Sequence, residues 1–319
     1  SKLASDGDEA AINAVAAHLE HENWHVRRAA SEALSLLAGL GAEGRAATAV
    51  AAGARLAHRR EEVRQAAVEA LAQVAERGDE RAAELALHLL EHADAGARRA
   101  AAQALEHLAA WGDPCAIDAL RLRLEDGDAG VRTAAVKALG RIAGRGVVGA
   151  SSLCLAHADE GVRQSSLQAL GVLAARGDRQ AVASAIVRLE DRAWTVRQAA
   201  VQTLGSIAER GDACTVSEVC RYLEREEASV REAATQALSQ VARKGDTSAV
   251  SALSARLEDP HFGVRSAAVE ALAQLAQKDD PRAIAEISSR LQHAAEGTRK
   301  AAAQALARIG VRRTLASIA

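Results

Sequence analysis

The stretch DAGVRTAAVKAL, residues 128–139, decides the fold of this chain because its pattern recurs along the whole sequence. In it, a Val-Arg step is followed by paired small residues and then by a leucine. The spacings between successive steps are 37, 34, 34, 31, 34, 34, 34 and 34 residues. The nine steps are Val26-Arg27, Val63-Arg64, Ala97-Arg98, Val131-Arg132, Val162-Arg163, Val196-Arg197, Val230-Arg231, Val264-Arg265 and Thr298-Arg299. Nine copies at this regularity indicate a stack of similar structural units.

Each repeat carries two apolar stripes with the period of an α-helix. Counted from the first residue of the step, which we term the Val site, offsets 0, 3, 4, 7, 8, 11 and 12 are mostly apolar or small, and offset 8 is always leucine. These offsets share one face of a helix with about 3.6 residues per turn. Another leucine lies seven residues before every Val site and ends a second stripe, such as Ile117, Leu120 and Leu124. Each repeat is therefore predicted to contain a helix A followed by a helix B.

The boundaries between repeats carry residues that end and begin helices. Gly-Asp pairs lie at residues 78–79, 112–113, 177–178, 211–212 and 245–246. Glycine tolerates the left-handed conformation that we expect to end helix B, and aspartate can cap the free amides that begin the next helix A. All three prolines follow an aspartate, as Asp113-Pro114, Asp259-Pro260 and Asp280-Pro281. Each pair predicts a helix that starts with an N-cap and a proline in its first turn.

The composition favours a helical, reducing-compartment protein that does not handle nucleic acid. Forty basic and forty-two acidic residues give a net charge of −2, whereas proteins that neutralise phosphates usually have a basic excess. The four cysteines fit neither a disulfide framework nor a metal knuckle, which favours the cytoplasm or another reducing compartment. They are Cys115, Cys154, Cys214 and Cys220. No apolar run approaches the roughly 20 residues that span a bilayer.

The string D-x-x-V-R-x-A-A-x-x-A-L resembles the HEAT repeat, specifically the short variety named after phycobilisome lyases. The resemblance covers essentially the whole chain and implies that helix B lines a concave face and helix A a convex one. Such repeats occur in scaffolds, bilin lyases, hydroxylases and DNA glycosylases, so the fold alone does not fix the function. HEAT-like hydroxylases bind iron through His-Glu pairs directly after the Val-Arg step, and no step here has one. Hydroxylase activity is therefore excluded.

We expect an all-α fold, a right-handed α-solenoid of nine two-helix repeats of about 34 residues, forming a single array over residues 1–319. Residues 1–6 are expected to be the tail of a truncated preceding helix, and 311–319 a cap or the start of a further helix. Helix pairs are expected to end near residues 41, 78, 112, 146, 177, 211, 245, 279 and 310. The irregular spacings predict a bulged loop near Gly41–Gly44 and a shortened or tilted helix near Val147–Ser152.

The leading functional hypothesis is a non-enzymatic scaffold or adaptor that binds a partner protein or peptide along the concave face, without cofactor, metal or catalytic residues. A bilin-lyase-like tetrapyrrole chaperone or enzyme is the alternative, and a nucleic-acid-handling protein a further one. The chain could also be an engineered array, although the irregular spacings and scattered cysteines favour a natural origin. No nucleophile elbow, phosphate loop or metal motif occurs in the sequence.

The candidate binding residues lie on the polar face of helix B, mainly at offsets 2, 6 and 10. Glutamine carries both a donor and an acceptor, so stacked glutamines could hold an extended peptide or a partner helix. The alternative is that these residues are only soluble helix formers on a wet face. The set is Gln65, Gln73, Arg99, Gln103, His107, Lys137, Arg141, Gln164, Gln168, Gln198, Gln202, Gln236, Gln240 and Gln274.

Three further groups of residues recur beside the Val site. Trp24, Trp194 and Phe262, two residues before it, are candidate aromatic anchors or could pack under the turn between the helices. The nine arginines of the step are expected to form a structural ladder with acids such as Asp94 and Asp128, rather than an anion site. Five histidines lie five residues before the Val site, too far apart to share a metal ion, and are expected to act as cations at the end of helix A. They are His21, His58, His92, His157 and His293.

Overall fold

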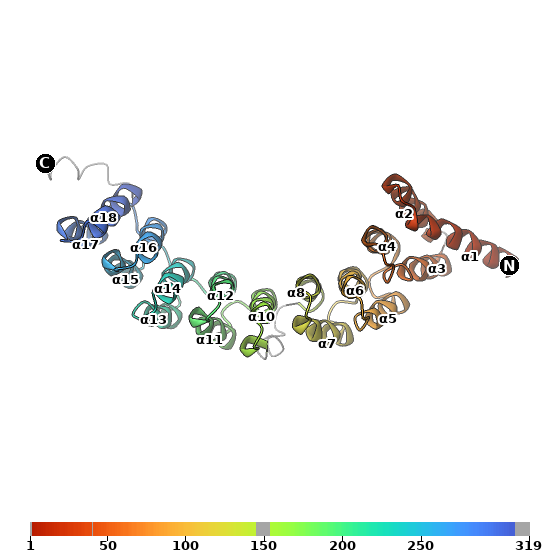
Figure 1. Ribbon diagram of the computed structural model, residues 1–319, viewed down its shortest axis with the longest axis horizontal. Coiled ribbons are helices and arrows are strands. Elements are labelled where there is room, and N and C mark those ends of the chain that lie inside the picture. The colour runs from red at the N-terminus through yellow and green to blue at the C-terminus, as the bar shows by residue number, and fades with distance from the viewer. Residues whose placement is uncertain (1, 40, 145–153, 310–319) are drawn as a thin grey trace. The chain divides into compact units, whose positions relative to one another are not determined.

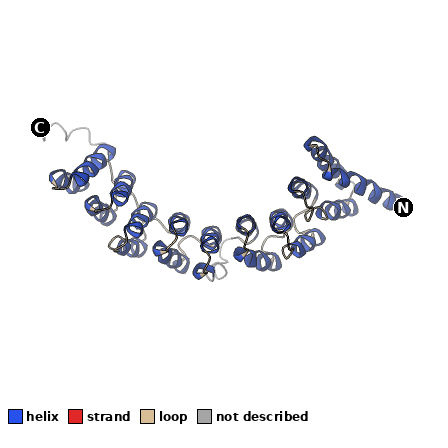
Figure 2. Cartoon of the chain, viewed as in Figure 1, coloured by secondary structure: helices blue, strands red, loops and turns tan. Residues whose placement is uncertain are grey.

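A computed structural model of the chain describes residues 2–39, 41–144 and 154–309, with the side chains of 2–8 left aside. Every regular element in these ranges is a helix (Figures 1 and 2). The B helices are α2 (Trp24–Ala38), α4 (Glu61–Val74), α6 (Ala95–Leu108), α8 (Ala129–Ile142), α10 (Glu160–Leu173), α12 (Trp194–Ile207), α14 (Ala228–Val241), α16 (Phe262–Leu275) and α18 (Glu296–Ile309). The A helices are α1 (Lys2–Ala17), α3 (Ala42–Gly53), α5 (Glu80–Leu89), α7 (Pro114–Leu122), α11 (Arg179–Val187), α13 (Ala213–Tyr222), α15 (Thr247–Ala255) and α17 (Pro281–Ser289). Short 3-10 turns follow several A helices: His18–Glu20, Arg123–Glu125, Cys154–Ala156, Arg188–Glu190, Arg256–Glu258 and Arg290–Gln292.

The helices pack into two compact units, residues 1–173 and residues 174–319. In the first unit, α2, α4, α6, α8 and α10 pack side by side as one layer, and α1, α3 and α5 pack as a second layer behind them. In the second unit, α12, α14, α16 and α18 form one layer, and α11, α13, α15 and α17 the other. Within each unit, the layer of B helices lies on the inner side of the curve that its own helices describe (Figure 1). The all-helical solenoid predicted from the repeats is confirmed.

The core of each unit consists of the two leucine positions and the small residues between them. The leucine at offset 8 is buried in every repeat, and the leucine seven residues before the Val site is buried in all repeats but the last, where Leu291 is half-buried. Buried alanines such as Ala134, Ala135 and Ala138 let adjacent B helices approach closely. Burying a leucine stabilises a fold by about 1.5–3 kcal/mol, so each repeat depends on its neighbours for its stability.

The glycine between repeats acts differently from the expectation. Each B helix that precedes one of these glycines ends three or four residues earlier, and the residue after α4, Ala75, is already extended. Gly78 then takes a φ of 90° and its N–H donates to the carbonyl of Leu108, at the end of the next B helix, over 2.7 Å. Gly112 donates likewise to Ile142 over 2.8 Å. The glycine therefore ties consecutive repeats together instead of capping its own helix.

The predicted N-caps are present, with one exception. The side chains of Asp79 and Asp113 accept backbone N–H groups of the first turns of α5 and α7, and Pro114 stands in the first turn of α7. Asp280-Pro281 begins α17 in the same way. The prediction for Asp259-Pro260 was wrong, because α16 starts only at Phe262. The Asp259 side chain is instead buried and accepts a hydrogen bond from Arg231.

The irregular repeats also differ from the expectation. Residues 42–44, expected in a bulged loop, already belong to α3, which has 12 residues where α5 has 10. The extra residues of the 37-residue spacing therefore lengthen this A helix and the turn after it, since a helix satisfies its own backbone groups and a loop does not. Residues 2–6, expected to be the tail of another helix, continue into α1 without a break. Segments 147–152 and 311–319 lie outside the described residues.

Two glycines allow a matched test of the left-handed turn. A Cβ at Gly112 or at Gly127 would meet no atom within 4 Å, but only Gly112 has a positive φ, of 75°. We expect Gly112→Ala to lower the free energy of unfolding by about 1–2 kcal/mol, because the left-handed conformation is unfavourable for alanine. Gly127→Ala should be neutral or slightly stabilising. Urea unfolding of both variants measures the difference, and equal effects would contradict the role of the turn.

Candidate functional site

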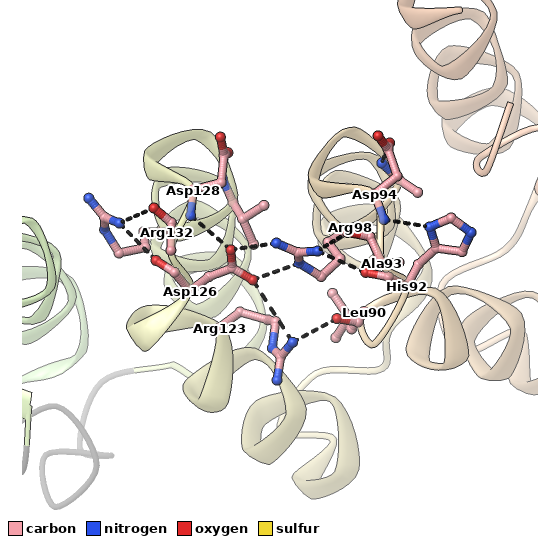
Figure 3. Close-up of polar contacts among 12 residues, drawn as sticks. Leu90, His92, Ala93, Asp94, Arg98, Arg123, Asp126, Asp128 and Arg132 are labelled. Atoms are coloured by element: carbon pink, nitrogen blue, oxygen red, sulfur yellow. Dashed lines mark hydrogen bonds and ion pairs between the residues drawn. The ribbon is translucent and has the colours of Figure 1, made fainter. Parts of the chain in front are cut away.

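The arginines of the Val-Arg steps hold the turns between helices A and B. At all nine of these arginines, Nη1 donates to the backbone carbonyls six and five residues before it. For Arg98 these are the carbonyls of His92 and Ala93, at 2.8 and 2.9 Å (Figure 3). Both carbonyls lie in the turn between α5 and α6, beyond the last residue of α5, and the guanidinium satisfies them there.

Arg98 and Arg231 each also bind a carboxylate of the following repeat through two hydrogen bonds. Arg98 donates through Nε and Nη2 to both oxygens of Asp126, at 2.7 and 2.8 Å, and Arg231 binds Asp259 in the same two-pronged geometry at 2.7 and 2.9 Å. Figure 3 shows Asp126 between Arg98 and Arg123. The Asp126 side chain is only 4 % exposed. Burial by itself disfavours its charged form, but the hydrogen bonds from Arg98 and from the backbone of Asp128 outweigh that effect and lower the pKa of Asp126.

The acids expected to pair with the arginines serve mainly as N-caps. Asp94 and Asp128 lie three residues before the Val site, and each accepts the backbone N–H of the Val-site residue at 2.9 Å. Asp159 does the same for Val162. The nearest of these carboxylates to an arginine is Asp94, at 3.9 Å from Arg64. The acids that bind arginine in two-pronged geometry lie two residues earlier, at the position that other repeats give to histidine.

The five histidines at that earlier position accept a hydrogen bond and do not act as cations. Nδ1 of His92 accepts the backbone N–H of Asp94 at 3.0 Å, and the other four make the same contact two residues ahead at 3.0–3.1 Å. A protonated imidazole donates from both nitrogens and could not accept this bond. Asp126 and Asp259 accept the equivalent N–H with a carboxylate oxygen. The position therefore holds a short acceptor, His or Asp, in eight repeats, whereas Arg225 occupies it in the seventh.

A second row of arginines, eight residues before the Val site, was not recognised in the sequence. Nη1 of Arg123 donates to the carbonyl of Leu90 at 2.9 Å, and Nη1 of Arg256 donates to that of Leu223 at 2.6 Å. Arg290 instead pairs with Glu258 at 2.9 Å. Each contact joins the end of one A helix to the end of the preceding one. The tripeptide Arg-Leu-Glu at 123–125, 188–190 and 256–258 was the signal that could have revealed it.

The candidate residues on the B helices all reach the surface. Each of the fourteen is exposed or half-buried, and in each unit they lie along the B layer, away from the A layer. In the second unit, the side-chain amide of Gln198 donates to that of Gln236, one repeat away, at 2.9 Å. Stacked glutamines therefore do occur. Because each amide has further donor or acceptor capacity, the pair can still bond to a partner.

One buried carboxylate fixes two basic side chains on the B layer of the first unit. Glu106 is 4 % exposed, although the equivalent offset 9 holds only Ser, Ala or Gly in the other repeats. Its oxygens lie 3.2 Å from Nε of Arg141 and 3.8 Å from Nζ of Lys137, both on the next B helix. Arg141 and Lys137 remain largely exposed. Lys137 and Arg141 therefore give α8 a basic surface, and α6 carries Arg99 and His107 on the same layer.

A groove of about 780 Å³ lies between α2 and α4 in the first unit. Its lining includes Trp24 and Glu32 from α2 and Glu61, Glu69 and Gln73 from α4. A smaller hollow of about 190 Å³ continues toward α6, where Arg99 and Gln103 line it. Four of the fourteen predicted binding residues, Gln65, Gln73, Arg99 and Gln103, therefore line these two hollows.

The predicted aromatic residues do not pack beneath the turn. Trp24, Trp194 and Phe262 are 54, 65 and 73 % exposed, and each is the first residue of its B helix. Sequence reasoning missed Trp111, which is also exposed and has the guanidinium of Arg77 at 4.1 Å from its ring centre. Its position just before the Gly-Asp boundary usually holds Arg or Lys, so the substitution itself was the available signal.

Within the described ranges, no group of three or more His, Cys, Asp or Glu side chains could hold a metal ion. No described helix is both long and apolar enough to cross a membrane. Cys154 is buried with its Sγ at 3.1 Å from a Glu125 oxygen, and burial together with that contact raises the pKa of its thiol to about 11. A thiol with such a pKa is a poor nucleophile at neutral pH.

Comparisons with known proteins identify the repeats. A family model described as HEAT repeats matches residues 49–140, 150–239 and 206–273, together more than half of the chain. The crystal structure of an engineered protein aligns with 93 % of this chain and 88 % of its own, at 21 % sequence identity and a TM-score of 0.41. None of the curated proteins matches the chain.

The buried Arg–Asp pairs predict a specific acid sensitivity. The pKa of Asp126 and of Asp259 is lowered in the folded state, so their stabilisation is present above the ordinary carboxyl pKa, about 4, and is lost as the pH falls through the lowered value. Asp126→Asn with Asp259→Asn should lower the free energy of unfolding at pH 7 by about 2–5 kcal/mol in total. The difference in the free energy of unfolding between the variant and the unmodified chain should become smaller below about pH 4. If urea unfolding gave the same difference in the free energy of unfolding from about pH 7 to about pH 3, the assignment would be contradicted.

The shared acceptor role of His and Asp predicts a stabilising substitution. His92→Asp keeps an acceptor for the N–H of Asp94 and adds a carboxylate to the position from which Asp126 binds Arg98, here facing Arg64. We expect an increase of about 1 kcal/mol in the free energy of unfolding at pH 7. His92→Ala is the control, since it removes the acceptor and should destabilise the chain. A His92→Asp variant as unstable as His92→Ala would show that the carboxylate does not reach Arg64.

Proposed function

From the premise that this chain belongs to the HEAT-repeat family, we propose that it is a non-enzymatic scaffold that binds another protein along its B helices. The HEAT fold generally mediates protein interactions. The short, phycobilisome-lyase type of repeat, suggested by the Val-Arg motif, is part of the same proposal. The proposal concerns the kind of partner and leaves its identity to experiment.

The observation that supports the proposal is a difference between the A–B turns and the exposed face of the B helices. Polar side chains of the A–B turns are occupied within the chain: the ladder arginines hold carbonyls, and the His or Asp acceptors hold backbone N–H groups. The polar side chains at offsets 2, 6 and 10 of the B helices project from a close-packed layer of alanines. A rigid layer with adaptable polar groups binds a partner at a low cost in conformational entropy.

The two units offer different chemistry to a partner. In the first unit, carboxylates lie around α2 and α4, and basic side chains lie on α6 and α8. In the second unit six of the twelve residues at the same offsets are amides: Gln198, Gln202, Gln236, Gln240, Gln274 and Gln304. Amides suit the polar backbone of a peptide, whereas charges select a partner by its side chains. Among the residues that the structure describes, no feature favours a tetrapyrrole or a nucleic acid over a protein partner.

The test compares B-face and A-face substitutions of equal number. Gln164, Gln168, Gln198 and Gln202 are changed to Ala on the B helices; the control changes Gln180, Ser217, Ser248 and Ser251, which are exposed on α11, α13 and α15. Tagged variants capture partners from the source cell, and quantitative mass spectrometry measures them. We expect the B-face variant to capture at least about tenfold less of the specific partner, because several hydrogen bonds of about 1 kcal/mol each are removed.

Folding of both variants is checked by circular dichroism and urea unfolding. Undiminished capture by the B-face variant, or equal loss with the A-face control, would refute the proposal that the B helices bind the partner.

A further inference from the structure

We propose that the groove between α2 and α4 binds an extended segment of the partner that carries Lys or Arg side chains, with one cation seated on Trp24. This inference rests on the proposed function, because it names the chemistry of the partner on one part of the B layer. The groove lies within the first unit, where the spacing between consecutive Val sites is 37 residues instead of 34.

The size of the groove suits a peptide segment. Its volume is about 780 Å³, and the smaller hollow of about 190 Å³ prolongs it toward α6. Neighbouring packed helices lie about 8–10 Å apart, so a segment that crosses α2, α4 and α6 spans about 20 Å. That distance corresponds to about six extended residues. Ser31 and Gln73 join across the groove through a 3.3 Å hydrogen bond and provide polar groups for a peptide backbone.

The charge of the lining favours a cationic segment. Four carboxylates face two guanidinium groups, and both arginines are engaged. Arg27 donates to the carbonyls of His21 and Glu22 in its own turn, and Arg28 pairs with Glu32 at 3.0 Å. The lining between α2 and α4 thus has an excess of negative charge, which complements Lys or Arg on that part of the partner segment, whereas Arg64 and Arg99 line the smaller hollow toward α6. The carboxylates are Glu32, Glu61, Glu62 and Glu69.

The carboxylates can exchange their present partners for a cation of the ligand. Glu61 pairs with Arg99 and Glu62 with Arg60, but the acid side chains are about two-thirds exposed. Glu69 accepts a 3.3 Å hydrogen bond from the amide of Gln65. Exposed ion pairs contribute only about 0–1 kcal/mol, so replacing them costs little.

Trp24 supplies a platform for the cation. Its ring lines the groove, is 54 % exposed, and stacks against His25 with 3.9 Å between the ring centres. Elsewhere the chain places its own arginine over an aromatic ring, at 4.1 Å for Trp111, 5.1 Å for Tyr222 and 5.9 Å for Phe262. A ligand cation over Trp24 would repeat this arrangement between two proteins.

The experiment titrates the full chain with synthetic peptides. The probe is an acetylated, amidated peptide of about eight residues that alternates Arg and Ser, long enough to span about 26 Å when extended. Its matched control replaces every Arg by Glu. Trp111→Phe with Trp194→Phe leaves Trp24 as the only tryptophan, so fluorescence reports on the groove. We expect saturable binding of the Arg peptide with a change in Trp24 emission, weakened by salt, and no binding of the Glu peptide.

Two sets of variants locate the site. Glu32→Gln with Glu69→Gln should weaken binding of the Arg peptide about tenfold, and Trp24→Ala, measured by calorimetry, about threefold to tenfold. Glu80→Gln with Glu84→Gln, which removes equal charge from α5 on the other layer, is the control and should change the affinity less than about twofold. Both pairs of substitutions are isosteric, and urea unfolding verifies that the variants fold.

Three results would overturn the inference: equal binding of the Glu peptide, equal weakening by the α5 control, or unchanged affinity in Trp24→Ala. These outcomes are separate from those of the capture experiment. Capture that depends on the B-face glutamines without any binding of the Arg peptide would refute only the cationic partner. Capture that is independent of the B face would refute the proposed function.

Discussion

The arginine that follows each Val site is the interaction on which the rest of the structure depends. It lies on helix B, and its guanidinium holds two carbonyls of the turn that leads from helix A to helix B, so one side chain ties that turn to helix B. The same contact recurs at all nine arginines and gives the described turns before the B helices a common geometry. Hairpins with similar turns can stack with their leucines and alanines in register, and the stack then buries a continuous core.

Contacts between repeats follow from that repeated shape. The glycine between hairpins donates its N–H to the end of the next B helix, and the second row of arginines reaches the end of the preceding A helix. Glycine also leaves room for the ladder, because a Cβ at Gly96 or Gly161 would overlap the arginine of the preceding repeat. The turns therefore consist of groups that satisfy one another, and such groups are poorly suited to bind a partner.

The polar side chains of the B-helix surface stay exposed or half-buried even where they pair with one another, and they vary from repeat to repeat. A buried alanine layer supports them, so substitution at offsets 2, 6 and 10 changes the chemistry of the surface without changing the packing. Carboxylates around α2 and α4, basic groups on α6 and α8, and amides in the second unit are three results of this freedom. Variation on a constant framework is the physical basis for selective recognition by a solenoid.

The sequence by itself determined the helices, their order and their buried faces, because a stripe with a period of about 3.6 residues and leucines at fixed offsets leaves no other way to bury the apolar groups. It also indicated that the polar side chains of helix B would reach the surface. Only the tertiary structure decided the partners of side chains in the turns: that Asp126, and not Asp128, binds Arg98, that histidines accept hydrogen bonds, and that Gly78 bonds to the next repeat. These contacts join adjacent repeats at distances set by the stacking. Spacing along one chain segment cannot distinguish two acids that are two residues apart, whereas the position of the neighbouring hairpin can.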